Sequence, residues 1–389
     1  MDFFKFSVPT KIVFSPGISK DFGAELETIG IQKYFIVTDS IIEKLKIIDP
    51  IIEGIKKAGY EVTGLFSDVP PDSGVKTIEK VAALAKASGA EGFIAIGGGS
   101  VLDTAKGANI LFTLGGNLID DYSGAQTITA DLSPLIAIPT TAGTGSEVTE
   151  AIVILDEVNQ VKLSFVDSHL LPTMTILDPE LTLKLPPLVT AGLGLDALTH
   201  AIEAVMSVQK GPVSDALAYQ AVRLIFNSIE KAVADGSDIE ARSDLLVASN
   251  LAGMAFNHSM VGVVHAVAHT VGALFHVHHG TANGIFLPFG MEYNLQERAS
   301  EIAFLAPAMG VTHCEHDDEK TALHCIQAVK DLINRLGQLC KFPTTFTQAG
   351  LKKENIDLIA ERSPDDGATF YNPREVNTDD LKPFIEKAF

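Results

Sequence analysis

The sequence predicts two domains: an α/β domain with a doubly wound parallel sheet over residues 1–185, and an all-α domain over residues 186–389. In the first part, short apolar runs alternate with segments of helical spacing, an alternation that is typical of parallel sheets. After the pair Pro186 and Pro187 the pattern becomes helical and few strand candidates remain. A chain of 389 residues is also too long for one ordinary core.

Each predicted strand and helix is supported by a local signal in the sequence. Buried strands are apolar runs that end at glycine, proline or aspartate, and several helices end at a glycine such as Gly59. The first residues, FFKFSVPTKIVFSPG, alternate apolar and polar side chains and predict a hairpin over 3–17. Other strands are expected at 34–39, 61–69 and 92–100 and from residue 134, and helices at 48–60, 73–90, 195–208 and 214–234.

Composition excludes several classes of partner. The formal net charge is −20, whereas nucleic acids and anionic membranes bind clustered lysine and arginine. Three cysteines without a C-x-x-C pair argue against a disulfide framework and favour a cytoplasmic protein. The first residues do not have the basic and apolar regions of a signal peptide.

One apolar stretch is long enough to cross a membrane. Residues 251–275 carry no Asp, Glu, Lys or Arg. They include Asn257 and three histidines, which are costly in hydrocarbon without partners. We therefore expect a buried core helix and no membrane partner.

The segment GFIAIGGGSVLDTAKG (92–107) predicts a phosphate-binding loop. Glycines let the backbone approach a pyrophosphate, and the following helix N-terminus offers free N–H groups. A tight strand-to-helix turn is the alternative, because the spacing is not G-x-G-x-x-G. The candidate residues are Gly97, Gly98, Gly99, Ser100 and Asp103.

A second loop, IPTTAGTGSEVT (138–149), also follows a strand and is rich in small hydroxyl side chains. Two such loops at one edge of a parallel sheet form a place where dinucleotides bind. Asp39, at the end of an earlier strand, suits ribose hydroxyls and would repel a 2′-phosphate, so NAD is favoured over NADP. The candidates in the second loop are Thr140, Thr141, Thr144, Ser146 and Thr149.

Carboxylate and imidazole groups recur at helical spacing in the second half. Asp196 and His200 are four residues apart, as are His265 and His269, and His279 follows. One carboxylate with three imidazoles suits a divalent metal such as Fe²⁺ or Zn²⁺. A single histidine is more often a satisfied core residue, but two such pairs on apolar helices favour a metal site.

Four motifs in this order resemble the iron-containing (group III) alcohol dehydrogenases: GGGSVLDTAKG, PTTAGTGSEVT, GLDALTHAIE and VHAVAHTVGALFHVHHGTANG. The similarity implies a Rossmann-like N-terminal domain that binds the dinucleotide and a helical domain that binds the metal, the dehydroquinate synthase-like architecture. It also implies the metal ligands Asp196, His200, His265 and His279. His269 matches a histidine near the nicotinamide, and Lys162 matches a basic residue that reaches the cofactor ribose.

The resemblance has one departure and one further implication. His276 and His278 precede the last ligand, where many members carry other residues, and this leaves the choice of ligand open. The context HGTAN favours His279, and we expect a sharp turn at Gly280. The family resemblance also implies homodimers or higher homo-oligomers built on N-terminal strands.

These observations predict a metal-dependent alcohol dehydrogenase or aldehyde reductase that exchanges hydride between NAD and a small primary alcohol, diol or aldehyde. His269 is the candidate proton relay. Three alternatives remain: a zinc polyol dehydrogenase of the glycerol type, a dehydroquinate-synthase-like lyase, and a non-catalytic metal-binding protein. The lyase would need basic residues for a phosphorylated substrate, and the helical half has few near its motifs.

Overall fold

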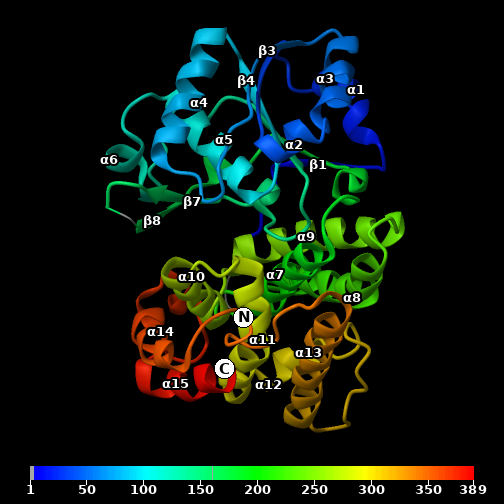
Figure 1. Cartoon of the computed structure of the whole chain (residues 1–389), viewed down its shortest axis with the longest axis vertical. Helices are drawn as coiled ribbons and strands as arrows, with labels where there is room; N and C mark the ends of the chain where they lie inside the picture. The colour runs from blue at the N-terminus through cyan, green and yellow to red at the C-terminus, as the bar shows by residue number, and fades with distance from the viewer. Residues whose placement is uncertain (1–3, 160) are drawn as a thin grey trace. The chain divides into compact units, whose positions relative to one another are not determined.

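The computed structural model describes residues 4–159 and 161–389 (Figure 1). The chain divides into two compact units. An α/β unit contains Ser7–Thr141 and Gly145–Thr182. A helical unit contains Leu183–Phe389, the short segment Ala142–Thr144 and the described residues before Ser7.

A six-stranded parallel sheet forms the centre of the α/β unit, as predicted. Its order is β1-β9-β6-β4-β2-β3, and every neighbouring pair is parallel. The order reverses between β2 and β4, so the two strands flank the switch point of the sheet. The strands are β1 Lys11–Phe14, β2 Lys33–Val37, β3 Glu61–Phe66, β4 Gly92–Gly97, β6 Leu135–Pro139 and β9 Met174–Leu177.

Both faces of this sheet are covered by helices. Alternate residues of β4 point to opposite faces: Phe93 and Ala95 join one apolar cluster, and Ile94 and Ile96 join another. The first cluster packs against α4 (Val75–Ser88) and α5 (Gly99–Thr113), and the second against α3 (Ile48–Lys57). Burial on both faces explains why β4 and β6 are apolar throughout. Shorter helices are α1 Gly23–Leu26, α2 Ser40–Lys44 and α6 Leu118–Tyr122.

A second, three-stranded sheet was not expected from the sequence. It has the order β5-β8-β7 and consists of β5 Gly124–Ala125, β7 Ala151–Asp156 and β8 Val161–Val166. β7 and β8 pair antiparallel, and β7 alternates buried and exposed residues as a half-buried strand should. The available signal was the short apolar run AIVIL, which is rich in β-branched residues and ends at Asp156.

The predicted N-terminal hairpin is wrong. Only β1 forms, and it pairs parallel with β9, about 160 residues later in the chain. Among the described residues before β1 there is no strand, and Phe4 is 47% exposed. Phe6 lies against the ring of His258, with the two centroids 4.2 Å apart. Alternation alone did not distinguish a hairpin from one edge strand preceded by an anchoring segment.

The helical unit is arranged around α7 (Pro187–Met206), in which every residue from Thr190 to Met206 is buried. α7 is long and apolar enough to span a membrane, but 89% of its apolar window lies buried inside the protein, as in a core helix. No described residue after Leu177 lies in a strand. The other helices are α8 Pro212–Ala234, α9 Ile239–Ser259, α10 Val263–Phe275, α11 His279–Tyr293, α12 Leu295–Phe304, α13 Asp318–Cys340, α14 Ile356–Arg362 and α15 Thr378–Lys387.

The apolar stretch 251–275 is not the single helix that we expected. It is divided between α9 and α10, whose axes are bent by 105°. Met260 lies at the break with φ 64° and ψ −179°, a conformation that non-glycine residues rarely adopt. The break redirects the chain so that α10 begins at Val263, two residues before His265.

We predict that Met260→Gly stabilises the protein by about 1 kcal/mol, because glycine removes a backbone strain of roughly 1–3 kcal/mol while some side-chain packing is lost. The measurement is the midpoint of urea unfolding. Val261→Gly is the matched control, since Val261 has no positive φ and should be destabilised by glycine. A lower midpoint for Met260→Gly would show that the side chain matters more than the strain.

Candidate metal and cofactor sites

Three predicted metal ligands converge in the helical unit. Asp196 comes from α7, His265 from α10 and His279 from α11, and one ligand atom of each lies within 4.8 Å of the others. Asp196 and His265 are buried, and His279 is partly exposed. Distant parts of the sequence thus bring together a carboxylate and two imidazoles, the donor types that borderline divalent metals prefer.

His200, the fourth predicted ligand, lies next to this group but not within it. Its ring stacks between those of His265 and Phe256, with centroid separations of 4.6 and 4.2 Å. Its Nδ1 is buried without a hydrogen-bond partner among the described residues. Such an atom is costly to bury, so Nδ1 needs a partner that this conformation does not supply.

Asn283 lies at the centre of the group and was missed in the sequence analysis. Its Nδ2 is 2.7 Å from Asp196 Oδ1, 3.2 Å from His265 Nε2 and 3.1 Å from His279 Nε2. The available signal was spacing, because Asn283 is four residues after His279 on the same helix. An amide nitrogen carries two hydrogens, so it cannot satisfy three acceptors.

These contacts fit a cation. Three acceptor atoms, on Asp196, His265 and His279, face the same point, and the two hydrogens of one amide nitrogen cannot satisfy all three. In the described part of the chain, Asn283 Oδ1 is also buried without a partner. Burial tends to raise the pKa of Asp196, but the surrounding imidazoles lower it to about 2. Burial lowers the pKa of His279 to about 4, against the opposing charge of Asp196. At neutral pH the group is therefore in the protonation state that metal binding requires.

The expected turn at Gly280 is wrong. The chain turns earlier, because His276 ends α10 in a left-handed conformation with φ 57°, and His278 immediately precedes α11. Gly280 lies inside α11, where a Cβ atom would overlap the carbonyl oxygen of Gly192 and contact Asp196. Glycine is required there for the close approach of α11 to α7, which brings His279 to Asp196.

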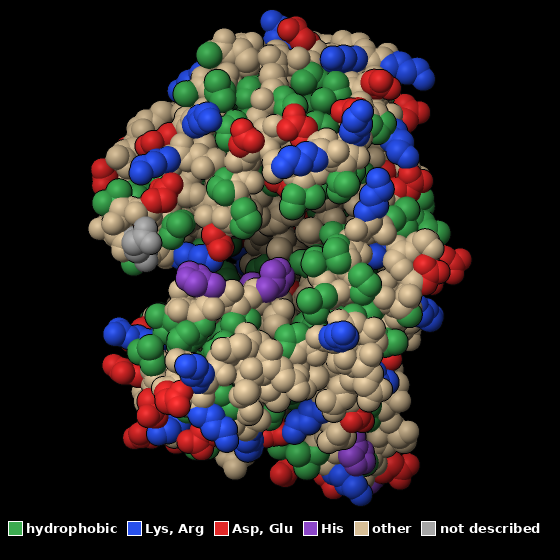
Figure 2. Space-filling model, viewed as in Figure 1, with side chains coloured by type: hydrophobic (Ala, Val, Ile, Leu, Met, Phe, Trp, Pro, Cys, Tyr) green, Lys and Arg blue, Asp and Glu red, His purple; other side chains and the backbone are tan. Residues whose placement is uncertain are grey.

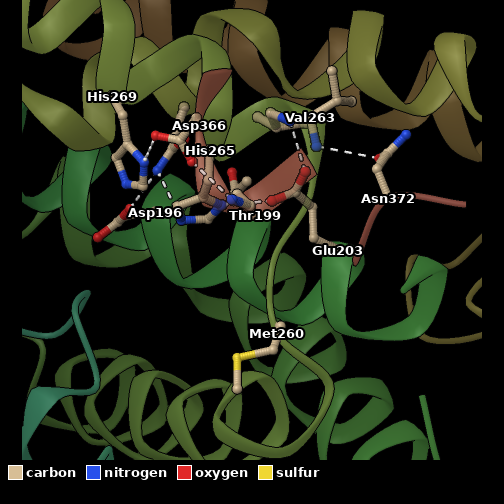
Figure 3. A network of polar contacts seen from close by, with 12 residues as sticks. Asp196, Thr199, Glu203, Met260, Val263, His265, His269, Asp366 and Asn372 are labelled. Carbon is tan, nitrogen blue, oxygen red and sulfur yellow. Dashed lines mark hydrogen bonds and ion pairs between the residues drawn. The ribbon is translucent and has the colours of Figure 1, made fainter. Parts of the chain in front are cut away.

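His269 lies beside the metal group without belonging to it (Figure 3). Its ring stacks on that of His279, with centroids 5.3 Å apart and planes at 13°. Its Nδ1 is 2.9 Å from Asp366 Oδ2. Burial tends to raise the pKa of Asp366, but the hydrogen bond and charge of His269 outweigh it and lower the pKa. Asp366 was also missed, because it is distant in sequence and follows no motif.

The predicted nucleotide residues other than Lys162 follow the carboxyl ends of β2, β4 and β6, which are neighbours in the sheet. Gly97 ends β4, and a Cβ there would overlap Val101. Gly98 is the N-cap of α5 and provides no capping side chain. The amide of Thr140 donates to the carbonyl of Gly97, which joins the two loops at 3.0 Å.

Asp103 is engaged by the protein itself. Ser146 Oγ donates to Oδ1 at 2.8 Å, and the amide of Val153 donates to Oδ2 at 3.1 Å. Lys106, one turn later, donates to the carbonyl of Thr149 at 2.7 Å, and burial lowers its pKa to about 8. Asp103 and Lys106 thus hold the second loop to α5. Thr144, another candidate, belongs to the helical unit with Ala142 and Gly143.

Lys162 lies on β8 and Asp39 follows β2, and both belong to the α/β unit. Lys162 Nζ is 2.6 Å from Asp72 Oδ1, and the amide of Asp72 donates to Ser100 Oγ at 3.3 Å, so Asp72 links Lys162 to the glycine loop. Asp39 Oδ1 accepts from the amides of Ile41 and Ile42 and caps α2. Among the described residues, no hydrogen bond reaches the other oxygen of Asp39.

The visible surface in Figure 2 carries charged side chains of both signs. On the face in Figure 2, acidic and basic side chains are interspersed, and histidines gather on the helical unit near α10.

Comparisons with known proteins match both parts of the chain. Residues 9–179 match the family model described as iron-containing alcohol dehydrogenase, and residues 190–389 match that of the C-terminal region of the Fe-containing alcohol dehydrogenase family. The chain is 35% identical to the NAD-dependent methanol dehydrogenase of Bacillus methanolicus, covering 98% of this chain and 99% of that protein. It is also 35% identical to the 1,3-propanediol dehydrogenase of Klebsiella pneumoniae, covering 99% of both. A crystal structure of a 1,3-propanediol oxidoreductase is similar over all of both chains, with a TM-score of 0.94 and 35% identity.

We predict that His279→Ala purifies with little metal and no activity, whereas His276→Ala and His278→Ala retain their metal. The reason is geometric: only His279 shares a group with Asp196 and His265. Loss of a ligand lowers metal affinity by more than the ~10–100-fold typical of a residue outside the ligand shell. The measurement is metal content by atomic emission, and a metal-free His278→Ala beside a metal-replete His279→Ala would reverse the assignment.

Proposed function

The chain belongs to the iron-containing alcohol dehydrogenase family, and from this we propose that it transfers hydride between NAD and a small primary alcohol or diol, or reduces the corresponding aldehyde. The convergence of Asp196, His265 and His279 on one point is the observation that carries this proposal. A non-catalytic metal protein would have no use for the two loops that follow β4 and β6 at the carboxyl edge of the sheet.

We assign Asp196, His265 and His279 as metal ligands, with His200 as the fourth after a rotation of its ring. A divalent iron ion bound there would act as a Lewis acid and lower the pKa of an alcohol hydroxyl. Zn²⁺ suits the same donors. The ionised carboxylate and the neutral imidazoles are ready to bind a cation at neutral pH, and Asp196 and His265 are held almost completely out of water.

His269 is the residue that we assign to proton transfer. Its side chain is 42% exposed, so it has access to both the metal group and solvent. Asp366 Oδ2 accepts a hydrogen bond from Nδ1 of His269. This contact fixes the ring and leaves Nε2 of His269 to exchange a proton with an alcohol or with water. Asp366 is therefore a positioning residue for His269.

The nucleotide cofactor is assigned to the α/β unit. The start of α5 offers backbone N–H groups and the positive end of a helix dipole to the pyrophosphate, with Gly97, Gly98, Gly99, Ser100 and Thr140 around it. Lys162 and Asp39 are assigned to the sugars. The loop after β6 contains the other candidates, Thr141, Thr144, Ser146 and Thr149.

The direct test is reduction of NAD⁺ by the Fe²⁺-loaded protein with a panel of short primary alcohols and diols, followed at 340 nm. Activity that disappears in Asp196→Ala and in chelator-treated protein supports the proposal. A loaded, folded protein that reduces NAD⁺ with no member of the panel, and oxidises NADH with no matching aldehyde, would contradict it.

We propose a homodimeric protein of the cytoplasm. The three cysteines are all free and at least partly buried, which suits a reducing compartment. β1 is an edge strand, and its exposed edge supports the dimer. Ile12 and Phe14 are 38% and 42% exposed. The amides of Lys11 and Ser15 point toward β9, which leaves the opposite edge of β1 open. An apolar edge strand with unused backbone donors is suited to pairing with a second copy.

We predict that Asp39→Gly increases the efficiency with NADP⁺ relative to NAD⁺ by about tenfold or more, because it removes a negative charge that would repel a 2′-phosphate. The measurement is kcat/KM for each coenzyme. A glycine at this position also removes the cap of α2, so Asp39→Asn, which keeps the cap, separates charge from stability. A native enzyme that prefers NADP⁺ would contradict the assignment.

We predict that Ile12→Pro shifts the protein toward monomer. In the parallel ladder, Lys11 and Ser15 donate to Thr173 and Leu177, so the N–H of Ile12 faces away from β9 and its loss leaves the sheet intact. Light scattering after size exclusion measures the shift. An unchanged oligomer would place the interface elsewhere.

A further inference from the structure

We propose that Glu203 is the residue that makes His265 a metal ligand, by holding the imidazole in the tautomer whose Nε2 is free of hydrogen. This inference rests on the proposed metal site. Glu203 lies on α7, seven residues after Asp196 and therefore on the same face of the helix, but it is not in the ligand group.

Glu203 contacts α10 through both of its carboxylate oxygens (Figure 3). Its Oε2 is 2.6 Å from Nδ1 of His265, and its Oε1 accepts from the amide of Val264 at 2.7 Å. Glu203 is only 1% exposed, so neither contact is weakened by water. One carboxylate thus holds both the ring and the backbone of the turn that carries it.

The second contact replaces a missing helix cap. The N-cap of α10 is Gly262, which has no side chain to accept from the first amides of the helix. Asn372 Oδ1 accepts from Val263 at 3.2 Å, and Glu203 accepts from Val264, so two side chains from outside α10 cap it. This fixes where α10 begins relative to α7.

The first contact determines the tautomer. A carboxylate facing Nδ1 requires the ring to donate there, which leaves Nε2 with its lone pair exposed. Asn283 agrees with this assignment, because its Nδ2, which donates to Asp196, lies 3.2 Å from His265 Nε2 and presents a donor group to it. Nε2 is therefore an acceptor, the state in which an imidazole binds metal.

Glu203→Gln tests this directly, because glutamine keeps the shape of the side chain. If its oxygen caps Val264, its amide nitrogen faces Nδ1 and requires Nδ1 to be the acceptor, which puts a hydrogen on Nε2. If the amide is reversed, two donors meet at Val264. In either case the arrangement that binds metal is disfavoured.

The experiment measures the affinity of the full-length protein for Co²⁺ by competition with a chromophoric chelator, together with the visible absorption of bound Co²⁺. We expect affinity to fall by about 10–100-fold in Glu203→Gln, with an altered Co²⁺ spectrum. Asp167→Asn is the matched control: Asp167 Oδ1 lies 2.7 Å from Nδ1 of His169 in the same kind of contact, outside the ligand group. Its affinity for Co²⁺ should remain native.

Two results would overturn the inference: native Co²⁺ affinity and spectrum in a folded Glu203→Gln protein, or hydrogen on Nε2 of His265 in the ¹⁵N spectrum of the metal-free native protein. The ¹⁵N spectrum is recorded on the native protein, so it tests the inference even if Glu203→Gln does not fold. A native protein that binds no Co²⁺ would refute the metal site itself, and the inference with it. A site that binds Co²⁺ but catalyses no reaction with alcohols would refute only the proposed activity.

Discussion

The close approach of α11 to α7 at Gly280 is the constraint on which the metal group depends. A side chain at this position would overlap the backbone of Gly192, and the helices would have to separate. Because His279 is the residue before Gly280 and Asp196 is one turn after Gly192, separation would also part the imidazole from the carboxylate. Packing between two helix backbones thus determines a distance between two functional atoms.

Burial away from water and the neighbouring charges together set the pKa values of the acidic side chains in and beside the metal group. Asp196, Glu203 and His265 are almost completely buried among the apolar residues of α7 and α10. Burial raises the pKa of Glu203, against backbone hydrogen bonds that act to lower it, whereas the imidazoles around Asp196 hold its pKa at about 2. Two carboxylates on one face of one helix therefore differ in character because their neighbours differ. Asn283 supplies a donor to the group, so the apolar surroundings do not leave every acceptor unpaired.

Much of this could be predicted from the sequence where local pattern and final environment agree. The apolar runs of β4 and β6 and the glycine after α4 each have one reasonable interpretation, and i, i+4 spacing identified Asp196 and His265 as site candidates. Features that depend on distant partners could not be predicted. β1 pairs with a strand about 160 residues away, Met260 adopts a conformation against its own preference, and Asn283 matters only once three helices meet. Glycine at 280 was recognised as special but for the wrong reason: it allows close packing instead of a turn.

The segment Ala142–Thr144 has a consequence for how such a protein can arise and change. It follows β6 of the α/β unit, yet it belongs to the helical unit, where Gly143 packs closely against Leu193 and its backbone contacts His200. The chain therefore passes from one unit to the other and back within three residues. No single cut separates two self-sufficient modules, since a fragment beginning at Leu183 loses a piece of its own core. Recombination that exchanges everything from Leu183 onward would therefore leave this piece of the interior behind.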